Sequence, residues 1–306
     1  MIKKITALFC LVFILFQVSI SAQVTTASIS GTVRDDNAVL PGAIIQALHV
    51  PSGTQYGTAA LENGRFHLPN LRVGGPYKIT ITFLGHEPTE INDVYLSLGQ
   101  EMEVNALMKA PGVNIQEVVV SGRQDPVFNT DHTGAVTNVS NQEIQMIPSI
   151  NRSLSDMVRI TPQSTGNNTF AGRNNLYNNL TINGSLFNNA FGLASLPGGQ
   201  TNSQPISLDA IDQVQVSMAP YDVRQSDFTG AGINAVTRSG TNEYTGSVYT
   251  YWRNQQYIGT KIENTTVARS NFNQSQSGFR LGGPIIKNKL FFFLECRNGT
   301  KKRTCT

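Results

Sequence analysis

The sequence predicts a mainly β protein, and three features point that way. Only 14% of its 306 residues are charged and 27 are glycine, which favours β-rich or loop-rich structure over long helices. Apolar and polar residues alternate in segments such as 29–33 and 77–83, as they do in strands with one buried face. Turn-forming residues separate these segments. At Asn63-Gly64 we expect a hairpin turn in which both residues take a positive φ.

The first 22 residues have the pattern of a secretory signal. Lys3 and Lys4 precede an almost wholly apolar run at 8–20, and Ala22 ends a small-residue cleavage site. A membrane anchor is the other reading, but the apolar run is shorter than the ~20 residues that a spanning helix needs. We therefore expect residues 1–22 to be an export signal that is removed.

Charge and motif content exclude several classes of function. The formal net charge is +3 and part of it lies in the signal, so nothing favours binding to nucleic acid. No cysteine lies between residues 11 and 295, so an exported chain would not depend on a disulfide framework. No nucleotide-binding or hydrolase motif occurs, and we expect no enzyme activity, no cofactor and no metal. The four histidines are scattered without metal-ligand spacing: His49, His67, His86 and His132.

Residues 23–110 are expected to form a β-sandwich, because short alternating strands are separated by frequent turns. The segment order ISGTV, LPGAIIQA, ENGRFHLPNL and YKITITFLGHE resembles the regulatory-like domain of carboxypeptidase D. That resemblance implies a prealbumin-like sandwich with no catalytic role. His86 departs from the family pattern, which has an aromatic residue after the glycine.

Residues 111–122 read as a linker followed by a short strand-forming run. Three consecutive valines at 118–120 stand between Glu117 and Ser121. A flexible β-forming segment of this kind can add as an extra strand to the sheet edge of a partner. The alternative is an ordinary strand of the domain that follows.

Residues 123–238 mix helical and strand signals, which predicts an α+β domain. Ser140 and Glu143 have the spacing of a helix capping box, and Pro148 ends that short helix. A second short helix is predicted where Leu154, Met157 and Val158 share one face.

The later part of this domain carries loop and strand signals. Residues 163–204 are rich in Asn and Gly and are expected to be loop. Asp209 is expected to cap a turn before a strand in which Val214, Val216 and Met218 share one face. Asn183 stands where Asp would be expected before the glycine.

Residues 239–306 contain the start of a membrane barrel pattern. Ser247, Tyr249 and Tyr251 alternate with their neighbours and suggest a first barrel strand with an interfacial aromatic girdle. Two further strands are expected at 277–282 and 290–294. The alternation stops after residue 294, which predicts a truncated barrel with an anomalous tail and a frameshift or early stop near Glu295.

The middle of the chain resembles a known receptor family. Residues 180–193, 206–242 and 230–251 are similar to Oar-like TonB-dependent outer-membrane receptors of the Bacteroidetes type. The resemblance implies that residues 123–238 are the plug domain and that the barrel begins at 239. It also implies a TonB box contacted by the TonB C-terminal domain, formed by Glu117, Val118, Val119, Val120 and Ser121.

The resemblance also suggests where a ligand would lie. Outward-facing plug loops help to hold the ligand in this family, and aromatic faces beside amide groups suit sugars or peptides. The alternative is that these aromatic residues pack the plug against itself or the barrel wall. The candidate contacts are Phe170, Tyr177, Phe187 and Phe191.

The implied function is energy-coupled uptake of a large ligand such as a glycan or peptide across the outer membrane. The expected partners are TonB, outer-membrane lipid if a full barrel exists, and a surface lipoprotein. A truncated chain would not transport alone, and two alternatives stay open. One is a soluble periplasmic TonB-binding or inert fragment, and the other is a non-catalytic accessory module of a peptidase.

Overall fold

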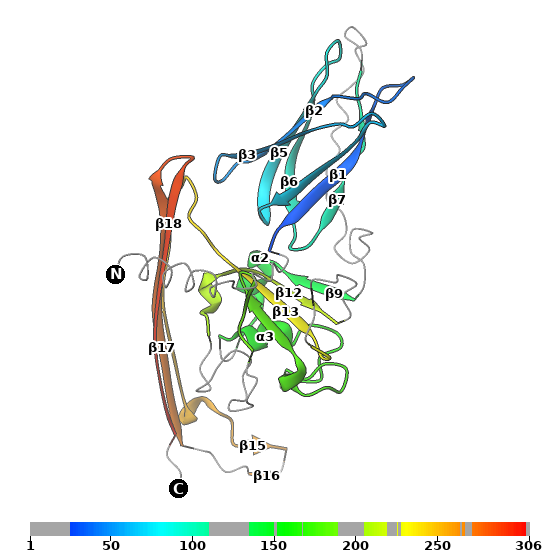
Figure 1. Cartoon of the computed structure of the whole chain (residues 1–306). Coiled ribbons are helices and arrows are strands. Elements are labelled where there is room, and N and C mark those ends of the chain that lie inside the picture. Colours follow the sequence, from blue (N-terminus) through cyan, green and yellow to red (C-terminus); the bar gives the residue numbers. More distant parts are fainter. Residues whose placement is uncertain are drawn as a thin grey trace, which may run out of the picture.

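The computed structural model describes residues 25–109, 135–149, 152–166, 168–188, 205–218, 225, 228–263, 265–266 and 271–303. These residues form three parts in chain order (Figure 1): a β-sandwich, a small α+β domain, and a long three-stranded sheet that runs beside the α+β domain. The predicted fold class, mainly β with a sandwich, an α+β region and a few barrel-like strands, is confirmed.

Two sheets form the sandwich. One has the strand order β3–β2–β5–β6, and in the other β4–β1–β7 are neighbours while β8 also pairs with β1. The strands are β1 Ala27–Arg34, β2 Ile44–His49, β3 Thr54–Ala59, β4 Arg65–Leu71, β5 Gly74–Thr82, β6 Thr89–Leu96, β7 Glu101–Glu103 and β8 Ala106–Leu107.

Alternate residues of these strands fill the space between the two sheets, as the sequence predicts. Ile29 and Val33 in β1 and Ile79 in β5 are fully buried in one hydrophobic core. Gly31 lies on the same face of β1, and a Cβ there would be 1.8 Å from the carbonyl oxygen of Val104. Glycine is required at this position because the backbone of a neighbouring segment occupies the space of a side chain.

The turn between β3 and β4 differs from the prediction at one residue. Gly64 has a φ of 71°, but Asn63 does not take a positive φ. Instead its side-chain Oδ1 accepts a hydrogen bond of 3.0 Å from the backbone N–H of Arg65. The asparagine thus stabilises the turn through its side chain, a role that asparagine often has in turns.

The α+β domain is built on one five-stranded sheet in the order β11–β10–β13–β12–β9. β10 and β13 are parallel, and the other pairs are antiparallel. Two short helices contact β12. The elements are β9 Val136–Val139, α2 Asn141–Met146, α3 Leu154–Val158, η1 Asn175–Tyr177, β10 Asn179–Ile182, β11 Ser185–Leu186, η2 Leu208–Ala210, β12 Ile211–Ser217 and β13 Gly232–Thr237.

Both predicted helices are present. Ser140 and Glu143 form the complete capping box, in which each residue's side chain accepts a hydrogen bond from the backbone N–H of the other. In α3 the three predicted face residues are all buried: Leu154, Met157 and Val158. Burial of this one apolar face anchors a helix that is too short to be stable alone.

The expectation that residues 163–204 are loop is wrong for part of that stretch. Asn179–Ile182 form β10, an inner strand whose four residues are all buried. The hairpin to β11 turns at Asn183 and Gly184, with φ values of 50° and 80°. Asn183 Oδ1 also accepts a hydrogen bond of 2.9 Å from the N–H of Thr237. Aspartate would tolerate this turn and this bond equally well, so both residue types fit here.

The three-stranded sheet is antiparallel in the order β14–β17–β18, with β14 Thr245–Asn254, β17 Phe272–Ile286 and β18 Leu290–Arg303. A short 3-10 helix at Gln255–Tyr257 and a small hairpin of β15 Lys261–Ile262 and β16 Thr265–Thr266 lie between β14 and β17. The expectation that the strand pattern stops after residue 294 is wrong, because β18 pairs with β17 as far as Arg303. Because the strand continues, there is no break in the strand pattern near Glu295 to indicate a frameshift.

Candidate functional site

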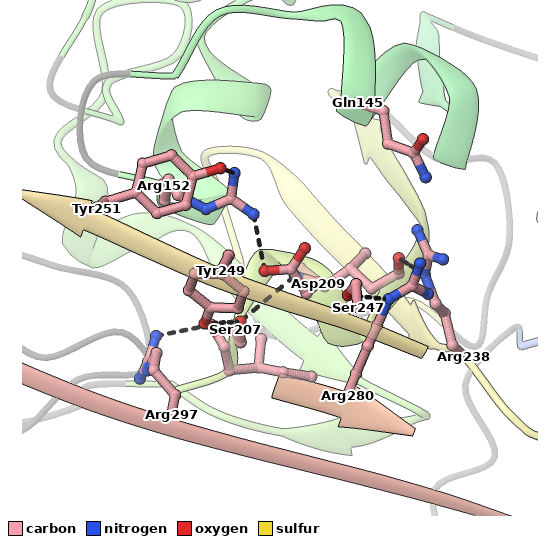
Figure 2. A network of polar contacts seen from close by, with 12 residues as sticks. Gln145, Arg152, Ser207, Asp209, Arg238, Ser247, Tyr249, Tyr251, Arg280 and Arg297 are labelled. Carbon is pink, nitrogen blue, oxygen red and sulfur yellow. Dashed lines mark hydrogen bonds and ion pairs between the residues drawn. The ribbon is translucent and has the colours of Figure 1, made fainter. Parts of the chain in front are cut away.

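The α+β domain meets the three-stranded sheet through a cluster of polar side chains around Arg152 (Figure 2). Arg152 precedes α3 and has a φ of 47°, a conformation that is uncommon for a residue with a side chain. Its Nη2 donates to Asp209 Oδ2 at 2.7 Å, and its Nη1 donates to the hydroxyl of Tyr251 at 2.5 Å. One guanidinium therefore joins a carboxylate of its own domain to a strand of the sheet.

Two tyrosines of β14 complete this arrangement. The guanidinium carbon of Arg152 lies 4.3 Å from the ring centroid of Tyr251 and 5.0 Å from that of Tyr249. A cation near an aromatic face is stabilised by the charge distribution of the ring. The Tyr249 hydroxyl is 3.2 Å from Ser207 Oγ. We call these five residues the Arg152 cluster: Arg152, Ser207, Asp209, Tyr249 and Tyr251.

Asp209 has a different role from the one expected. The turn before β12 is capped by Ser207, whose side chain accepts a hydrogen bond from the N–H of Asp209. The Asp209 side chain is thereby free to pair with Arg152, and each side chain of this ion pair is 20% exposed. The sequence does carry a signal for this cap, because serine two residues before Asp209 is a common capping residue.

Further arginines line the same junction (Figure 2). Arg280 Nε donates to Ser247 Oγ at 2.7 Å, joining β17 to β14, while Arg297 Nη1 lies 3.4 Å from the carbonyl oxygen of Ile206. Arg238 Nε donates to the carbonyl oxygen of Ile211 at 3.1 Å. Burial lowers the pKa of Arg238 to about 10, and the nearby charge of Arg280 adds to this effect. Arg238 is still cationic at neutral pH.

The strand register gives the three-stranded sheet two unlike faces. Tyr249 lies directly opposite Gly278, where a Cβ would be 2.5 Å from the tyrosine hydroxyl oxygen. Gly278 thus makes room for the tyrosine on the face toward the α+β domain. On the other face, Val248 pairs with Phe279, and these side chains are 85% and 41% exposed. The exposed apolar side chains on this face also include Trp252, Leu281 and Leu294.

This arrangement corrects one prediction about the tyrosines. Tyr249 and Tyr251 were expected to form part of an interfacial girdle, but both contact the α+β domain through Ser207 and Arg152. The alternation along the strand was recognised, whereas which face is turned to the other domain depends on contacts far apart in sequence. No sequence signal singles out Arg152.

The other predicted site residues have different outcomes. Glu117, Val118, Val119, Val120 and Ser121, and also Phe191, lie outside the described residues. Phe170 is fully buried in the core of the α+β domain, so it packs that domain against itself and presents no surface to a ligand. Tyr177 and Phe187 are 53% and 38% exposed. The Tyr177 ring lies beneath the guanidinium of Arg173 at 5.9 Å.

Among the described residues there is neither a metal-binding cluster nor a helix that could cross a membrane. No group of three or more His, Cys, Asp or Glu side chains there is arranged to hold a metal ion. Within the same residues, no helix is both long enough and apolar enough to span a membrane.

Comparison with known proteins identifies two regions of the chain. Residues 28–109 match the carboxypeptidase regulatory-like domain, and residues 236–304 match an outer membrane beta barrel domain. The second match extends beyond residue 294, in agreement with the length of β18. The chain is 26% identical over 288 residues to the TonB-dependent transporter Oar of Myxococcus xanthus, an alignment that covers 88% of this chain.

The chain spans about a quarter, 26%, of the length of Oar, to which it is homologous. The sandwich domain, the barrel portion and the relationship to Oar confirm the resemblance seen in the sequence. Among solved structures, the siderophore receptor PirA from Acinetobacter baumannii aligns at 21% identity, a TM-score of 0.41, and 55% and 24% coverage of this chain and that one. The ferric enterobactin receptor PfeA of Pseudomonas aeruginosa aligns at 15% identity with a TM-score of 0.41. That alignment covers 56% of this chain and 25% of the receptor chain.

Proposed function

We propose that this chain is the front portion of a TonB-dependent outer-membrane receptor that takes up a large ligand, such as a glycan or a peptide. The observation that carries the proposal is the junction at the Arg152 cluster. A small α+β domain is held by an ion pair and two tyrosines against the polar face of a sheet, and the opposite face of that sheet is apolar and exposed. A plug held inside a barrel wall needs this combination.

The sheet suits a lipid-facing wall on chemical grounds. Transmembrane barrel strands alternate between an apolar outer face and a polar inner face. Val248, Phe279 and Leu281 lie on the exposed face, while Ser247 and Tyr249 lie on the face toward the plug. We infer that the chain is exported by residues 1–22 and that this sheet belongs to an outer-membrane barrel.

We further propose that the TonB C-terminal domain binds residues 117–121 by strand addition. Hydrogen bonds between backbones supply the affinity in this mode, and alternate side chains supply the specificity. TonB would deliver the work of transport by pulling on this segment, so the chain itself would need no cofactor and would catalyse no reaction.

Three of the four candidate aromatic residues stay candidates for contact with the ligand. Tyr177 and Phe187 are exposed. We propose that these two, together with Phe191, contact the ligand, and that Phe170 supports them by filling the plug core. A surface lipoprotein would be a further partner on that side.

Calorimetric titration of the full chain with the TonB C-terminal domain tests the proposal. Proline at position 119 removes a backbone N–H and should abolish strand addition. We expect binding by the wild type, loss of binding by Val119→Pro, and unchanged binding by the matched control Val113→Pro. Equal binding by both variants would place the partner elsewhere, and no binding by the wild type would refute the proposal.

A further inference from the structure

The sandwich contacts both of the other parts of the chain, and its contact with the α+β domain is made through two glutamines of β12. The N–H of Leu98, in the turn after β6, donates to Gln213 Oε1 at 2.9 Å. Gln215 Nε2 donates to the carbonyl oxygen of Leu98 at 2.6 Å, and Gln213 Nε2 lies 3.4 Å from the carbonyl oxygen of Leu96. Side-chain amides thus bind the backbone of the turn as a neighbouring strand would.

This contact is buried rather than superficial. Gln213 and Gln215 are only 8% and 4% exposed. Val73 and Leu98 of the sandwich are also buried, yet neither belongs to the hydrophobic core of either domain. Leu98 is the residue whose backbone N–H and carbonyl oxygen bind the two glutamines, so the contact lies in a buried part of the chain. A buried amide that loses its hydrogen-bond partner is left unsatisfied, so breaking the contact in place is unfavourable.

The contact continues into the sheet of the α+β domain. Gln215 Oε1 lies 3.4 Å from Asn234 Nδ2 in β13, and Asn234 Oδ1 accepts a hydrogen bond from the hydroxyl of Thr181 in β10. All three side chains are nearly fully buried. Hydrogen bonds therefore connect the sandwich to three adjacent strands of this sheet, β12, β13 and β10.

A second contact ties the sandwich to the three-stranded sheet. The N–H of Asn242, just before β14, donates to the carbonyl oxygen of Pro51 at 2.8 Å. Asn242 is in turn bound twice to Asn288 in the β17–β18 turn, by side-chain and backbone hydrogen bonds of 2.7 and 2.8 Å. At Gly53 a Cβ would lie 2.1 Å from Asn288 Oδ1, and Gly53 also has a φ of 66°. The positive φ favours glycine here, and a larger residue would also displace the Asn288 amide.

We propose that the sandwich is a brace that ties the α+β domain to the sheet from one side of the junction. In Figure 1 the β17–β18 turn lies at the end of the long sheet nearest the sandwich, and β12 lies below the sandwich. The sandwich, moving as one body, would hold both the β17–β18 turn and β12. The α+β domain cannot move away from the sheet on this side unless the glutamine contact or the asparagine contact opens. The brace goes beyond the proposed function, because it depends only on these intramolecular contacts.

A brace has a property that two independent contacts lack. If one rigid body bridges two elements, loosening either contact lowers the effective concentration of the other. The double variant Gln213→Ala/Gln215→Ala should therefore loosen the distant Asn242–Pro51 hydrogen bond, although neither glutamine touches it. Asn288→Ala removes a partner of Asn242 on an exposed turn. By the same argument it should loosen the distant Leu98–Gln213 hydrogen bond.

Residue-resolved hydrogen exchange of the full chain without any partner protein tests the brace. The double glutamine variant should raise the exchange rates of the Leu98 and Asn242 amides at least about tenfold each. Asn288→Ala should raise the Leu98 rate in the same direction, and it provides a second variant if the first does not fold. The control Gln163→Ala, at an exposed glutamine of the α+β domain, should leave both rates unchanged.

Two results would overturn the proposal. An unchanged Leu98 rate in the double variant would mean that the glutamines do not hold the sandwich. A raised Leu98 rate with an unchanged Asn242 rate would mean that the contacts act separately. Neither result depends on whether TonB binds residues 117–121, so a failure of the brace is distinguishable from a failure of the proposed function.

Discussion

Arg152 Nη2 and Asp209 Oδ2 are 2.7 Å apart, and each of the two side chains is only 20% exposed. The same guanidinium also reaches the Tyr251 hydroxyl and the rings of Tyr249 and Tyr251. Lysine could keep the ion pair, but its single ammonium group could not make all of these contacts at once. The identity of the side chain, and not only its charge, is therefore expected to matter.

We predict that Arg152→Ala lowers the free energy of unfolding of the junction by about 1–3 kcal/mol, because Asp209 is left without its partner. Arg152→Lys should recover part of this loss. Trp252 is the chain's single tryptophan and lies on the face of β14 opposite the junction, so its fluorescence during denaturant unfolding follows the unfolding of that strand. Arg173→Ala is the matched control, since Arg173 contacts an exposed tyrosine of the same domain. Full recovery of stability by the Lys variant would contradict this role of the guanidinium.

The capping box of α2 gives a second prediction, in which the glutamate matters more than the serine. Glu143 Oε2 accepts hydrogen bonds of 2.7 and 2.8 Å from the N–H and the hydroxyl of Ser140. The reciprocal bond from the Glu143 N–H to Ser140 Oγ is 3.5 Å long. Glu143→Ala should therefore destabilise the helix by about 1 kcal/mol, at least as much as Ser140→Ala. Thermal unfolding of both variants checks the order. A clearly larger loss for Ser140→Ala would reverse it.

His49 makes the stability of the sandwich depend on pH. Burial lowers the pKa of His49 to about 4, and the charge of Arg72 acts in the same direction. The ring is 4% exposed, and its Nδ1 lies 2.6 Å from Ser52 Oγ. Below the unfolded-state pKa of 6.5, the unfolded chain takes up a proton that the folded chain does not. Stability should therefore be full above pH 6.5 and fall by roughly 2–4 kcal/mol as the pH approaches 4.

Urea unfolding at several pH values measures this dependence. His49→Asn can keep a hydrogen bond to Ser52 but cannot be protonated, so its stability should vary less between pH 6.5 and 4.5. The slope is the decisive quantity, because loss of the ring contact with Tyr77 lowers the variant's stability at every pH. The same slope in both proteins would show that His49 does not cause the effect.

Local patterns were sufficient to predict much of the fold. The alternation at Ile29 and Ile79, the capping box at Ser140 and the α3 face at Met157 all describe interactions within a few residues, or the burial of one face. Strand β10 was missed because its Asn and Thr residues resemble a loop. They lie in an inner strand that pairs with β13 on one side and β11 on the other, and the pairing with β13 involves residues distant from any local pattern.

The candidate site was harder to predict for the same physical reason. Arg152 and Tyr251 are 99 residues apart in sequence, and neither carries a local signal for the other. The docking of Leu98 on Gln213 spans 115 residues and involves a backbone group, which has no sequence signature at all. The continuation of β18 beyond residue 294 was missed because polar residues such as Arg297 face the α+β domain there.

The central claim is that TonB engages residues 117–121, and a hydrogen-exchange footprint of the full chain with the TonB C-terminal domain tests it most directly. Strand addition forms backbone hydrogen bonds, so amides that join the partner's sheet exchange more slowly. We predict new protection in peptides that cover residues 117–121 and none at the edge strand β3 of the sandwich. Protection at β3 with unchanged exchange at 117–121, or no protection anywhere at saturating partner, would contradict the account.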